Sequence, residues 1–578
     1  MKKTITKRGQ KILKKFSKAS LKASEDSKEH IKENLFQRIS HIANIRLLIL
    51  EWGLLVVALI MLAVTQAFWF GDSYAENTWT TGGTYTEATL GEVDSMNPLF
   101  ATTNSERALS RLLFSTLAAN DYSGHPKPEL AQSITPSEDG KIWTVKLREN
   151  LKWSDGEPIT NEDVMFTFSL IKNPAVTTIY DANLANVKVA EGENGTIVFT
   201  LPTAYADFIS ALIIPIVPKH ELADSDPKTL IEDSFSNAPV TSGPFTFNAV
   251  QSGTLTQDET FYLSVNPNYY KEGAMLGSFA VHAYTERDDI IGAINSGSIT
   301  ATAELNEADA EKVATGKFLQ KNSSLDSGAF IFFNTSSAKL KDAEVRRAIR
   351  QGIDMAEVRA NVPEAEAIDY PILESQMKLT AYPALPEYNA DAAKAKLAEL
   401  RGGENVSLEL ATVNTGILPK VTETVAESLR NLGYEVNVTA YEENQEFISS
   451  VLSKRNYDIL VYDIELGADP DPLPYYHSSQ ASKSGLNLSN YRNALVDDLL
   501  LAGRETLDQS LRVKKYESFL EYWVNEVPAI AIYRSNLTYY YNRNVRTFSN
   551  DLRLVTALDR FTDVTNWAVN NTTKNKTP

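Results

Sequence analysis

The chain has 578 residues, of which 43% are hydrophobic and 22% are charged, as is ordinary for a folded protein of about two to four globular units. It contains no cysteine, which excludes disulfide bonds, thiolate nucleophiles, iron–sulfur clusters, cysteine-type zinc sites and a lipid on an N-terminal cysteine. Residues 1–46 carry 13 Lys and Arg against 4 Asp and Glu, and the rest carry 43 against 70, so a tail of charge +9 precedes a body of charge −27. The acidic body argues against nucleic acid as a partner, because phosphate binding needs a basic folded surface.

The first predicted element is a helix over residues 47–70, LLILEWGLLVVALIMLAVTQAFWF. Residues 52–70 carry no charge, which is about the length that a helix needs to cross a bilayer. Aromatic side chains stand at both ends, at Trp52 and at residues 68–70, as in a membrane-interface belt. Because the basic residues precede the span, we predict a single-pass protein of the cell membrane with residues 1–46 in the cytoplasm and the body outside.

Two other interpretations of this segment stay open. Ser73 and Ala75 have the spacing of a signal-peptide cleavage site, although the apolar run is longer than usual and the preceding tail is very long. A buried core helix would also be apolar on all sides. The basic tail either lies on the anionic inner leaflet or is solvated. A polar linker over residues 71–82 leads to the body.

The most informative segment of the body is LRENLKWSDGEPITNEDVMFTFSLIKN, residues 147–173. An apolar strand is predicted through residues 143–153, followed by a turn at Asp155-Gly156. Thr160 and Asp163 have the spacing of a capping box, which predicts a helix that begins at Thr160. Physical chemistry alone therefore predicts a strand, a turn and a capped helix.

Further segments of the body carry recognisable patterns in a fixed order. They are DSMNPL (94–99), PELA (128–131), SGPF (242–245), NPNYY (266–270), FIFFNT (330–335), KDAEVRRAIRQGID (341–354, with Asp342 as the predicted N-cap), YDIL (457–460) and PAIAIY (528–533). Together with residues 147–173, this series resembles the extracellular solute-binding proteins of family 5, the peptide-, oligopeptide- and nickel-binding components of ABC transporters. The resemblance covers roughly residues 80–540.

The resemblance implies a two-lobe fold of the type II periplasmic-binding-protein class, in its large peptide-binding cluster. Alternating strands and helices independently predict the α/β class. We expect lobe I over residues 80–328 and 532–568, with a subdomain inserted at about 115–240. Lobe II is expected over 329–531, and residues 569–578 form a polar C-terminal end.

Residues 457–472, YDILVYDIELGADPDP, form an apolar strand that leads into an acidic, Pro-rich loop. In the family, the corresponding loop carries the carboxylate that pairs with the α-ammonium of a bound peptide. The resemblance therefore implies that Asp469 and Asp471 bind the ligand, although this loop has one residue fewer than the family pattern. A charge-assisted bond of this kind contributes about 1.5–3 kcal/mol. The alternative is that the two aspartates cap the following turn.

The resemblance also implies that a peptide backbone pairs with strand edges between the lobes. Phe332, Phe333, Asn334 and Tyr462 stand on segments expected to face the hinge and cleft. We predict ligand contacts for Phe333, Asn334 and Tyr462, and the alternative for each is core or hinge packing.

An enzyme would need a focused constellation of residues. The sequence has no Gly-rich phosphate loop, no G-x-S-x-G and no H-E-x-x-H, and its six histidines are scattered. We predict no catalytic residues, no cofactor and no metal. The expected function is capture of oligopeptides by a monomer and their delivery to the permease subunits of an ABC transporter. The long tail keeps open a tethered peptide sensor or scaffold without a transport role, and an enzyme on the same scaffold is a third possibility.

Overall fold

The computed structural model describes residues 46–570 and 573–575, apart from residues 78, 80, 181–183, 185, 254–257, 314, 315, 317, 443 and 444. The chain divides into two compact units. One contains Met1–Thr78 and Thr572–Pro578, and the other contains Trp79–Asn571. Residues 1–45 of the predicted basic tail lie outside the described residues.

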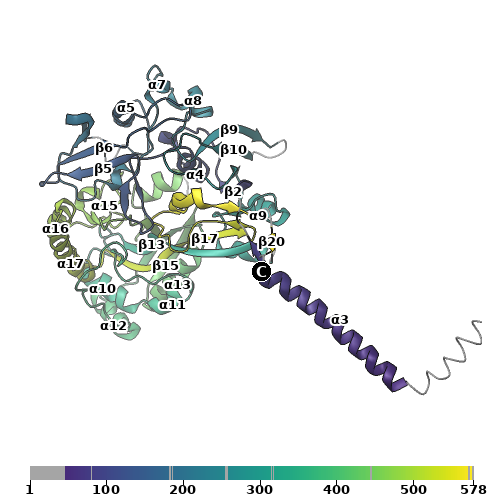
Figure 1. Cartoon of the computed structure of the whole chain (residues 1–578). Coiled ribbons are helices and arrows are strands. Elements are labelled where there is room, and N and C mark those ends of the chain that lie inside the picture. Colours follow the sequence, from purple (N-terminus) through teal and green to yellow (C-terminus); the bar gives the residue numbers. More distant parts are fainter. Residues whose placement is uncertain are drawn as a thin grey trace, which may run out of the picture. The chain divides into compact units, whose positions relative to one another are not determined.

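The first unit contains a long helix and a short two-stranded sheet. Helix α3 (Arg46–Tyr74) is followed by β1 (Ala75–Asn77), which pairs antiparallel with β20 (Thr573–Asn575) (Figure 1). The predicted linker 71–82 and the predicted C-terminal end therefore contain paired strands.

The helix predicted over residues 47–70 is confirmed, because it lies wholly within α3. The prediction that it crosses a membrane is not confirmed, since no helix in the described part of the chain is long and apolar enough to do so. The side chains described in α3 are those of residues 51–66, a shorter stretch than the about 20 residues that a crossing takes.

One ten-stranded sheet runs through the second unit, in the order β15-β14-β16-β13-β17-β12-β2-β11-β10-β9. The strands are β15 (Glu435–Tyr441), β14 (Ser407–Val413), β16 (Ile459–Glu465), β13 (Phe318–Phe333), β17 (Ala529–Asn542), β12 (Ala301–Thr302), β2 (Thr84–Leu90), β11 (Ser278–Tyr284), β10 (Glu259–Val265) and β9 (Phe245–Ser252). The pairs β14–β15, β14–β16, β12–β2 and β2–β11 are parallel, and the other neighbours are antiparallel.

The unit has two large hydrophobic cores, one for each lobe. The core of lobe II draws its buried residues from Ala329 to Tyr533. Helices in this range are α10 (Ala343–Gly352), α11 (Met355–Arg359), α12 (Ala390–Arg401), α13 (Leu418–Asn431), α14 (Gln445–Phe447), α15 (Leu473–Tyr476), α16 (Ala494–Glu505) and α17 (Gln509–Glu526). Asp342 caps α10 as predicted, because its carboxylate accepts the backbone N–H of Glu344 at 2.8 Å.

The core of lobe I combines residues 85–301 with residues 537–567. It includes α4 (Asn104–Leu113), and a smaller neighbouring cluster packs against α9 (Arg287–Ser296). Short strands β18 (Val545–Arg546) and β19 (Ala568–Val569) pair near the C-terminal end of this lobe.

A subdomain within lobe I has a four-stranded antiparallel sheet of order β5-β6-β8-β7. Its elements are β3 (Ala118–Asn120), β4 (Pro126–Pro128), β5 (Ala131–Pro136), β6 (Ile142–Leu147), α5 (Asn161–Ile171), β7 (Lys188–Glu191), β8 (Ile197–Thr200), α7 (Lys219–Leu222) and α8 (Ser234–Asn237). At the start of α5, the Asp163 carboxylate accepts the backbone N–H of Thr160 at 2.7 Å. The Thr160 hydroxyl donates to the same oxygen at 3.1 Å, so the predicted capping pair forms with the hydroxyl as donor.

The long strands β13 and β17 pass from one lobe to the other, side by side and antiparallel (Figure 1). On β13, Leu325 packs against the core of lobe I, whereas Ala329 belongs to the core of lobe II. Their register shifts between Ser324 and Gly328. A Cβ atom at Gly328 would lie 3.0 Å from the backbone oxygen of Tyr533 and 2.7 Å from Ile368 Cδ1, so glycine allows the two crossing strands to approach closely.

Asp326, which lies at this irregularity, is fully buried. Its carboxylate forms ion pairs with Arg534 of β17 and with Arg553 of lobe I, and it accepts a hydrogen bond from Ser375 Oγ at 3.2 Å. Its backbone N–H donates to Val555 O at 3.1 Å, and its carbonyl accepts the N–H of Leu466 at 2.8 Å. One acidic residue therefore links both crossing strands to segments of both lobes.

We predict that Asp326→Asn destabilises the protein by about 3–5 kcal/mol, because the substitution leaves two buried guanidinium groups without their shared carboxylate. Denaturant unfolding of the two proteins measures the difference. Asp369→Asn is the matched control, since Asp369 is half-exposed and pairs with Arg359 at 2.8 Å, an interaction expected to contribute at most about 1 kcal/mol. Equal losses in the two variants would contradict the proposed role of Asp326.

Candidate functional site

A cavity of about 440 Å³ lies where the two lobes meet. Lobe I contributes Leu305 and the β13 residues Gln320 and Asn322, and lobe II contributes the segments 362–365 and 413–418. Tyr462 and Asp463 of β16 also line it, as do Tyr533 and residues 535–538 of β17. The volume is in the range typical of small-ligand sites. Because both lobes line this cavity, movement of one lobe against the other would open or close it.

The lining mixes apolar side chains with polar groups. Asn536 Nδ2 donates to Glu364 O at 3.0 Å, Gln320 Nε2 donates to Asn322 Oδ1 at 3.1 Å, and Ser535 Oγ donates to the Asp463 carboxylate. Burial, assisted by Asp463, raises the pKa of Tyr533 above its ordinary value, so its phenol stays protonated. Such a lining can accept both the amide groups and the apolar side chains of a ligand.

Tyr462 lies in this cavity wall, as the prediction of a ligand contact requires. It pairs with Phe330 across β16 and β13, and its ring centroid lies 5.9 Å from that of Phe447. Phe333 is fully buried in the core of lobe II, as is Phe332. The side chain of Asn334 donates to Tyr457 O at 2.9 Å and accepts a bond from Asn490 at 3.1 Å. The positions of Phe333 and Asn334 add no support to their predicted ligand contacts, which stay predictions.

Asp469 and Asp471 follow β16 in the predicted acidic loop, and each is paired with an arginine. Arg512 of α17 binds both carboxylate oxygens of Asp469, with Nη1 2.8 Å from Oδ1. Arg504 of α16 donates from Nε to Asp471 Oδ2 at 2.9 Å. Asp471 also accepts the N–H of Leu473 at 3.4 Å, as the alternative of a turn cap predicts. Neither aspartate is among the residues that line the cavity.

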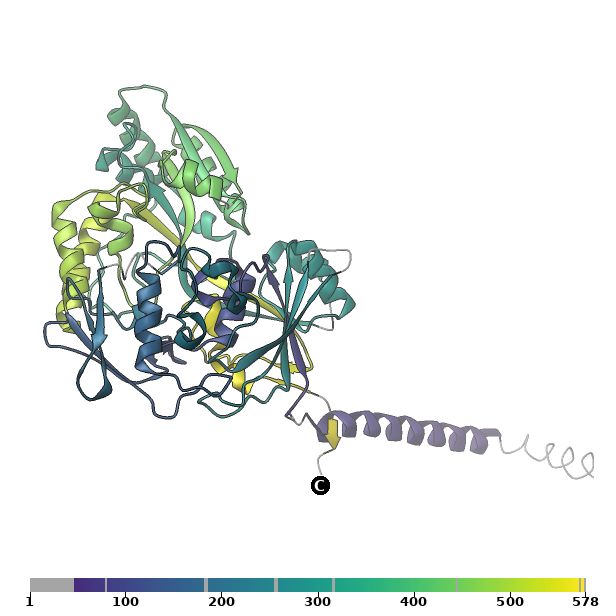
Figure 2. The same ribbon diagram turned by 90° about the horizontal axis from the view of Figure 1, so that it is seen from above.

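The inserted subdomain reaches these pairs through residues 205–207. The backbone N–H of Ala206 donates to Arg504 O at 2.8 Å, and the Arg504 guanidinium lies 5.0 Å from the centre of the Tyr205 ring. Figure 2 shows the blue subdomain beside the yellow-green helices α16 and α17. The sequence gives little signal of this contact, because Tyr205 and Asp207 lie 262 or more residues before Asp469 and match no motif.

Asp207 adds a third carboxylate to the two arginine pairs. Burial raises the pKa of Asp207 well above its ordinary value, and the charge of Asp469 raises it further, while Arg512 opposes both. Burial likewise raises the pKa of Asp469, against the effect of Arg512. Three carboxylates thus share two guanidinium groups, which leaves one negative charge without a counter-charge unless a proton or a ligand cation neutralises it. The sequence gives one indication that Asp207 is buried, which is the position of this acidic residue between the aromatic residues Tyr205 and Phe208.

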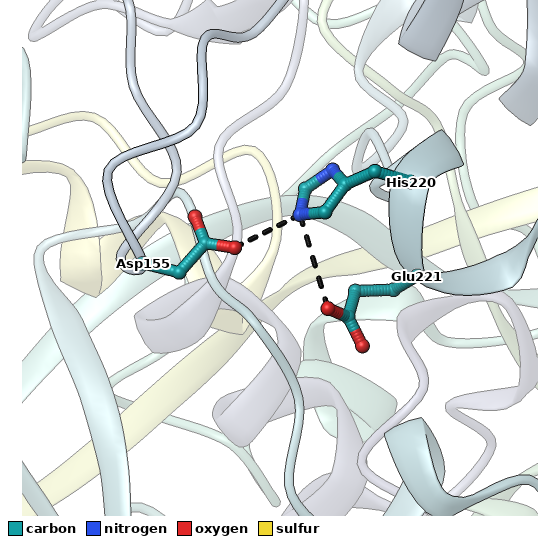
Figure 3. Close-up of side chains that lie close together, drawn as sticks. All are labelled: Asp155, His220 and Glu221. Atoms are coloured by element: carbon teal, nitrogen blue, oxygen red, sulfur yellow. Dashed lines mark hydrogen bonds and ion pairs between the residues drawn. The ribbon is translucent and has the colours of Figure 1, made fainter.

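One group of possible metal ligands lies elsewhere on the subdomain. Figure 3 shows Asp155, from the predicted turn, beside His220 and Glu221 of α7. His220 Nε2 is 2.9 Å from Asp155 Oδ2 and 3.9 Å from Glu221 Oε1. Among the described residues this is the one group whose ligand atoms are close enough to hold a metal ion, and all three residues are exposed. The hydrogen bond between His220 and Asp155 accounts for their closeness.

Two lobes on crossing strands, with a cavity lined from both, define a solute-binding protein of the periplasmic type. Residues 125–487, well over half of the chain, match the bacterial extracellular solute-binding proteins, family 5. The chain belongs to this family, which confirms the resemblance inferred from the motifs.

Individual proteins agree with this assignment. The chain is 25% identical over 481 residues to the oligopeptide-binding protein AppA of Bacillus subtilis, a match that covers 79% of this chain and 87% of AppA. The solved structure of that AppA with a nonapeptide is 22% identical, has a TM-score of 0.69 and covers 85% of this chain and 100% of AppA. NikZ of Campylobacter jejuni, solved with Ni(L-His), also has a TM-score of 0.69, with 21% identity and coverage of 84% and 99%. The two-lobe α/β fold is thereby confirmed.

We predict that Asp207→Asn stabilises the protein increasingly as the pH rises above about 4, the ordinary carboxyl pKa. The folded state holds a proton on Asp207 that the unfolded state has already lost, so the stability of the wild-type protein falls with pH until the folded carboxyl titrates. Asparagine removes this loss. Urea unfolding at a series of pH values measures the difference.

Asp224→Asn is the control for this experiment, because Asp224 is an exposed aspartate of the same subdomain. Its free energy of unfolding should stay within about 0.5 kcal/mol of the wild-type value, because the substitution is on the surface. If the stability difference between Asp207→Asn and the wild type does not change with pH, the pKa of Asp207 is not raised in the folded protein.

Proposed function

We propose that this protein captures oligopeptides in the cavity between its lobes and delivers them to an ABC transporter for import. The observation that carries the proposal is the 440 Å³ cavity with a lining from both lobes. Membership of the solute-binding family supports the proposal. The similar AppA is named an oligopeptide-binding protein, and its solved structure contains a nonapeptide. The mixed polar and apolar lining suits a peptide, which offers both kinds of group.

The proposed mechanism is a clamp. The lobes exchange between open and closed states about β13 and β17, and the ligand shifts the population because it contacts both lobes only in the closed state. The rim of the closed form is then recognised by the permease. The protein acts as a monomer and as a carrier, with no covalent change in the ligand.

The acidic loop is the proposed site of the ligand's α-ammonium. Asp469 and Asp471 are both paired with arginines, and the neighbouring Asp207 keeps its proton because burial raises its pKa, so a ligand ammonium group would bind there in exchange for that proton. Asp463, in the cavity wall, stands six residues before Asp469 on the same strand and loop. A peptide with its body in the cavity would therefore extend its N-terminal end toward this loop, past Tyr462.

Peptide binding is the test of this function. The protein should bind a mixed-sequence oligopeptide with a free amine by isothermal titration calorimetry, and Asp469→Asn should weaken that binding about tenfold or more. An N-acetylated peptide of the same sequence should bind the two proteins alike, because it has no ammonium group. Native mass spectrometry of gently purified protein should also reveal retained peptide.

Asp224→Asn, on the surface of the subdomain, is the matched control and should bind both peptides as the wild type does. Equal losses for both peptides in Asp469→Asn would reject the ammonium site while leaving peptide capture intact. Absence of binding to a varied peptide library would reject the oligopeptide function itself.

We further propose that residues 47–70 anchor the protein in the cell membrane, with its N-terminus in the cytoplasm and its body outside. The support is the uncharged run 52–70, the basic tail that precedes it and the exposure of apolar side chains along α3, Leu54, Leu59 and Leu62 among them. The length of the tail also favours, as a second candidate function, a tethered peptide sensor or scaffold. In that case peptide binding would occur without import.

The anchor predicts that the full chain stays in the membrane pellet after an alkaline carbonate wash, whereas a chain beginning at Trp79 is released as a soluble, folded protein. Immunoblotting of pellet and supernatant measures both. Release of the full-length gene product as a shorter species beginning near Glu76 would instead establish cleavage after Ala75.

A further inference from the structure

The lining of the cavity between the lobes carries charge of one sign. Its described lining residues include the carboxylates of Glu364 and Asp463 and contain no Lys, Arg or His. The Asp463 carboxylate accepts the hydroxyl of Ser535. Glu364 is exposed, and it takes part in none of the ion pairs between described residues. A ligand in the cavity therefore meets two carboxylates and no cationic side chain.

The cations that stand beside lining residues in the chain do not offset these carboxylates. Lys321 lies between two lining residues of β13, but its Nζ donates to a backbone carbonyl of lobe I at 2.7 Å, away from the lining. Arg534 lies between two lining residues of β17, where it binds Asp326 and lies 3.0 Å from Glu366. Arg553 is the second partner of Asp326, so two carboxylates compensate these two guanidinium groups.

The remaining cations near the lining segments are also paired or lie in solvent. Those with carboxylate partners are Arg287 with Asp309 at 3.8 Å, Lys312 with Asp288 at 3.3 Å and Arg359 with Asp369 at 2.8 Å. Lys420 of α13 is exposed and does not line the cavity. The start of α13, which does line it, contributes the equivalent of about half a positive charge. Glu442, which accepts Asn414 Nδ2 at 2.9 Å, adds a carboxylate beside this helix end. The excess of negative charge at the lining therefore persists when the neighbours are counted.

Further carboxylates continue from the cavity toward the acidic loop. Glu465 lies two residues after Asp463 on β16, so the two side chains are on the same face of the sheet. The hydroxyl of Tyr475 donates to the backbone carbonyl of Glu465. Burial raises the pKa of Tyr475, and the charges of Asp471 and Asp463 raise it further, which places this phenol close to both carboxylates. Negative groups thus border the whole path from the cavity to the proposed ammonium site.

We propose that the cavity selects oligopeptides with a lysine or arginine side chain, with Glu364 and Asp463 as the acceptors of its charged end. This inference rests on the proposed function and adds the class of peptide to it. The methylene groups of such a side chain suit apolar lining residues such as Leu305 and Leu537, while its cationic end forms charge-assisted hydrogen bonds with the carboxylates. An acidic side chain at the same place would add a third negative charge and be repelled.

The test is calorimetric titration of the full chain with a set of short alanine peptides that have a free amine, at constant ionic strength. One position at a time is Lys, norleucine or Glu. Norleucine has an apolar chain like that of Lys without the ammonium group, so the ratio of the two affinities isolates the charge. At one position the Lys peptide should bind at least about fivefold more tightly than the norleucine peptide, and the Glu peptide more weakly than either.

Two variants assign this preference to the lining. In Asp463→Asn the ratio of Lys to norleucine affinity should fall at least about threefold, and in Glu364→Gln it should fall by about twofold, because Glu364 is exposed. A general loss of binding cancels in the ratio. Glu364→Gln is a surface substitution, so it provides the test even if Asp463→Asn does not fold. Glu366→Gln is the matched control, since Glu366 is in the same segment but does not line the cavity, and it should keep the wild-type ratio.

The other outcomes separate this inference from the function on which it rests. Absence of binding by every peptide would overturn the proposed function and this inference with it. Binding of the norleucine peptides without a preference for Lys at any position would overturn this inference alone and leave peptide capture standing. A preference for Lys that neither Asp463→Asn nor Glu364→Gln reduces would also overturn it, because the cation would then bind elsewhere.

Discussion

The buried carboxylate of Asp326 is the constraint on which the two-lobe arrangement depends. It lies where β13 leaves the core of lobe I for that of lobe II, and it holds Arg534 of the opposite crossing strand and Arg553 of lobe I. Its backbone also bonds to residues 466 and 555, one from each lobe. A buried Asp326 carboxylate without its arginines would be strongly unfavourable. The segments that carry Asp326, Arg534 and Arg553 must therefore meet in the folded protein. These bonds hold the two crossing strands against both lobes.

The position of the crossing decides which side chains face the cavity. Gln320 and Asn322 precede it on β13, and residues 535–538 stand near it on β17, so the two crossing strands contribute both polar and apolar groups to the cavity lining. The strand β16 adds Tyr462 and Asp463 and then leads into the acidic loop. One strand therefore contributes to the cavity wall and continues directly into the acidic loop. The pairing of β16 with β13 at Ser327–Phe333 positions both.

Local signals in the sequence predicted local structure well. The Thr160–Asp163 capping pair, the Asp342 cap and the α/β alternation need information from a few residues each, and the order of the family motifs identified the two-lobe fold. The partners of Asp469 and Asp471 were not predictable, because Arg512 and Arg504 lie 43 and 33 residues further along, on other elements. Phe333 illustrates a different limit, because an apolar residue beside a cleft motif can face the ligand or pack into the core, and the sequence pattern is the same for both.

Charge counted across elements, rather than along the chain, distinguishes structural groups from binding groups. Arg346 and Asp326 have full complements of partners, and their role is to join segments. Asp207, by contrast, adds a third carboxylate beside two arginine pairs, which is an excess of one negative charge when all three carboxylates are ionised. A folded protein retains such an excess only where a proton, an ion or a ligand relieves it, since desolvation opposes every uncompensated charge. At the acidic loop, the ammonium group proposed as ligand would take the place of the proton that Asp207 holds.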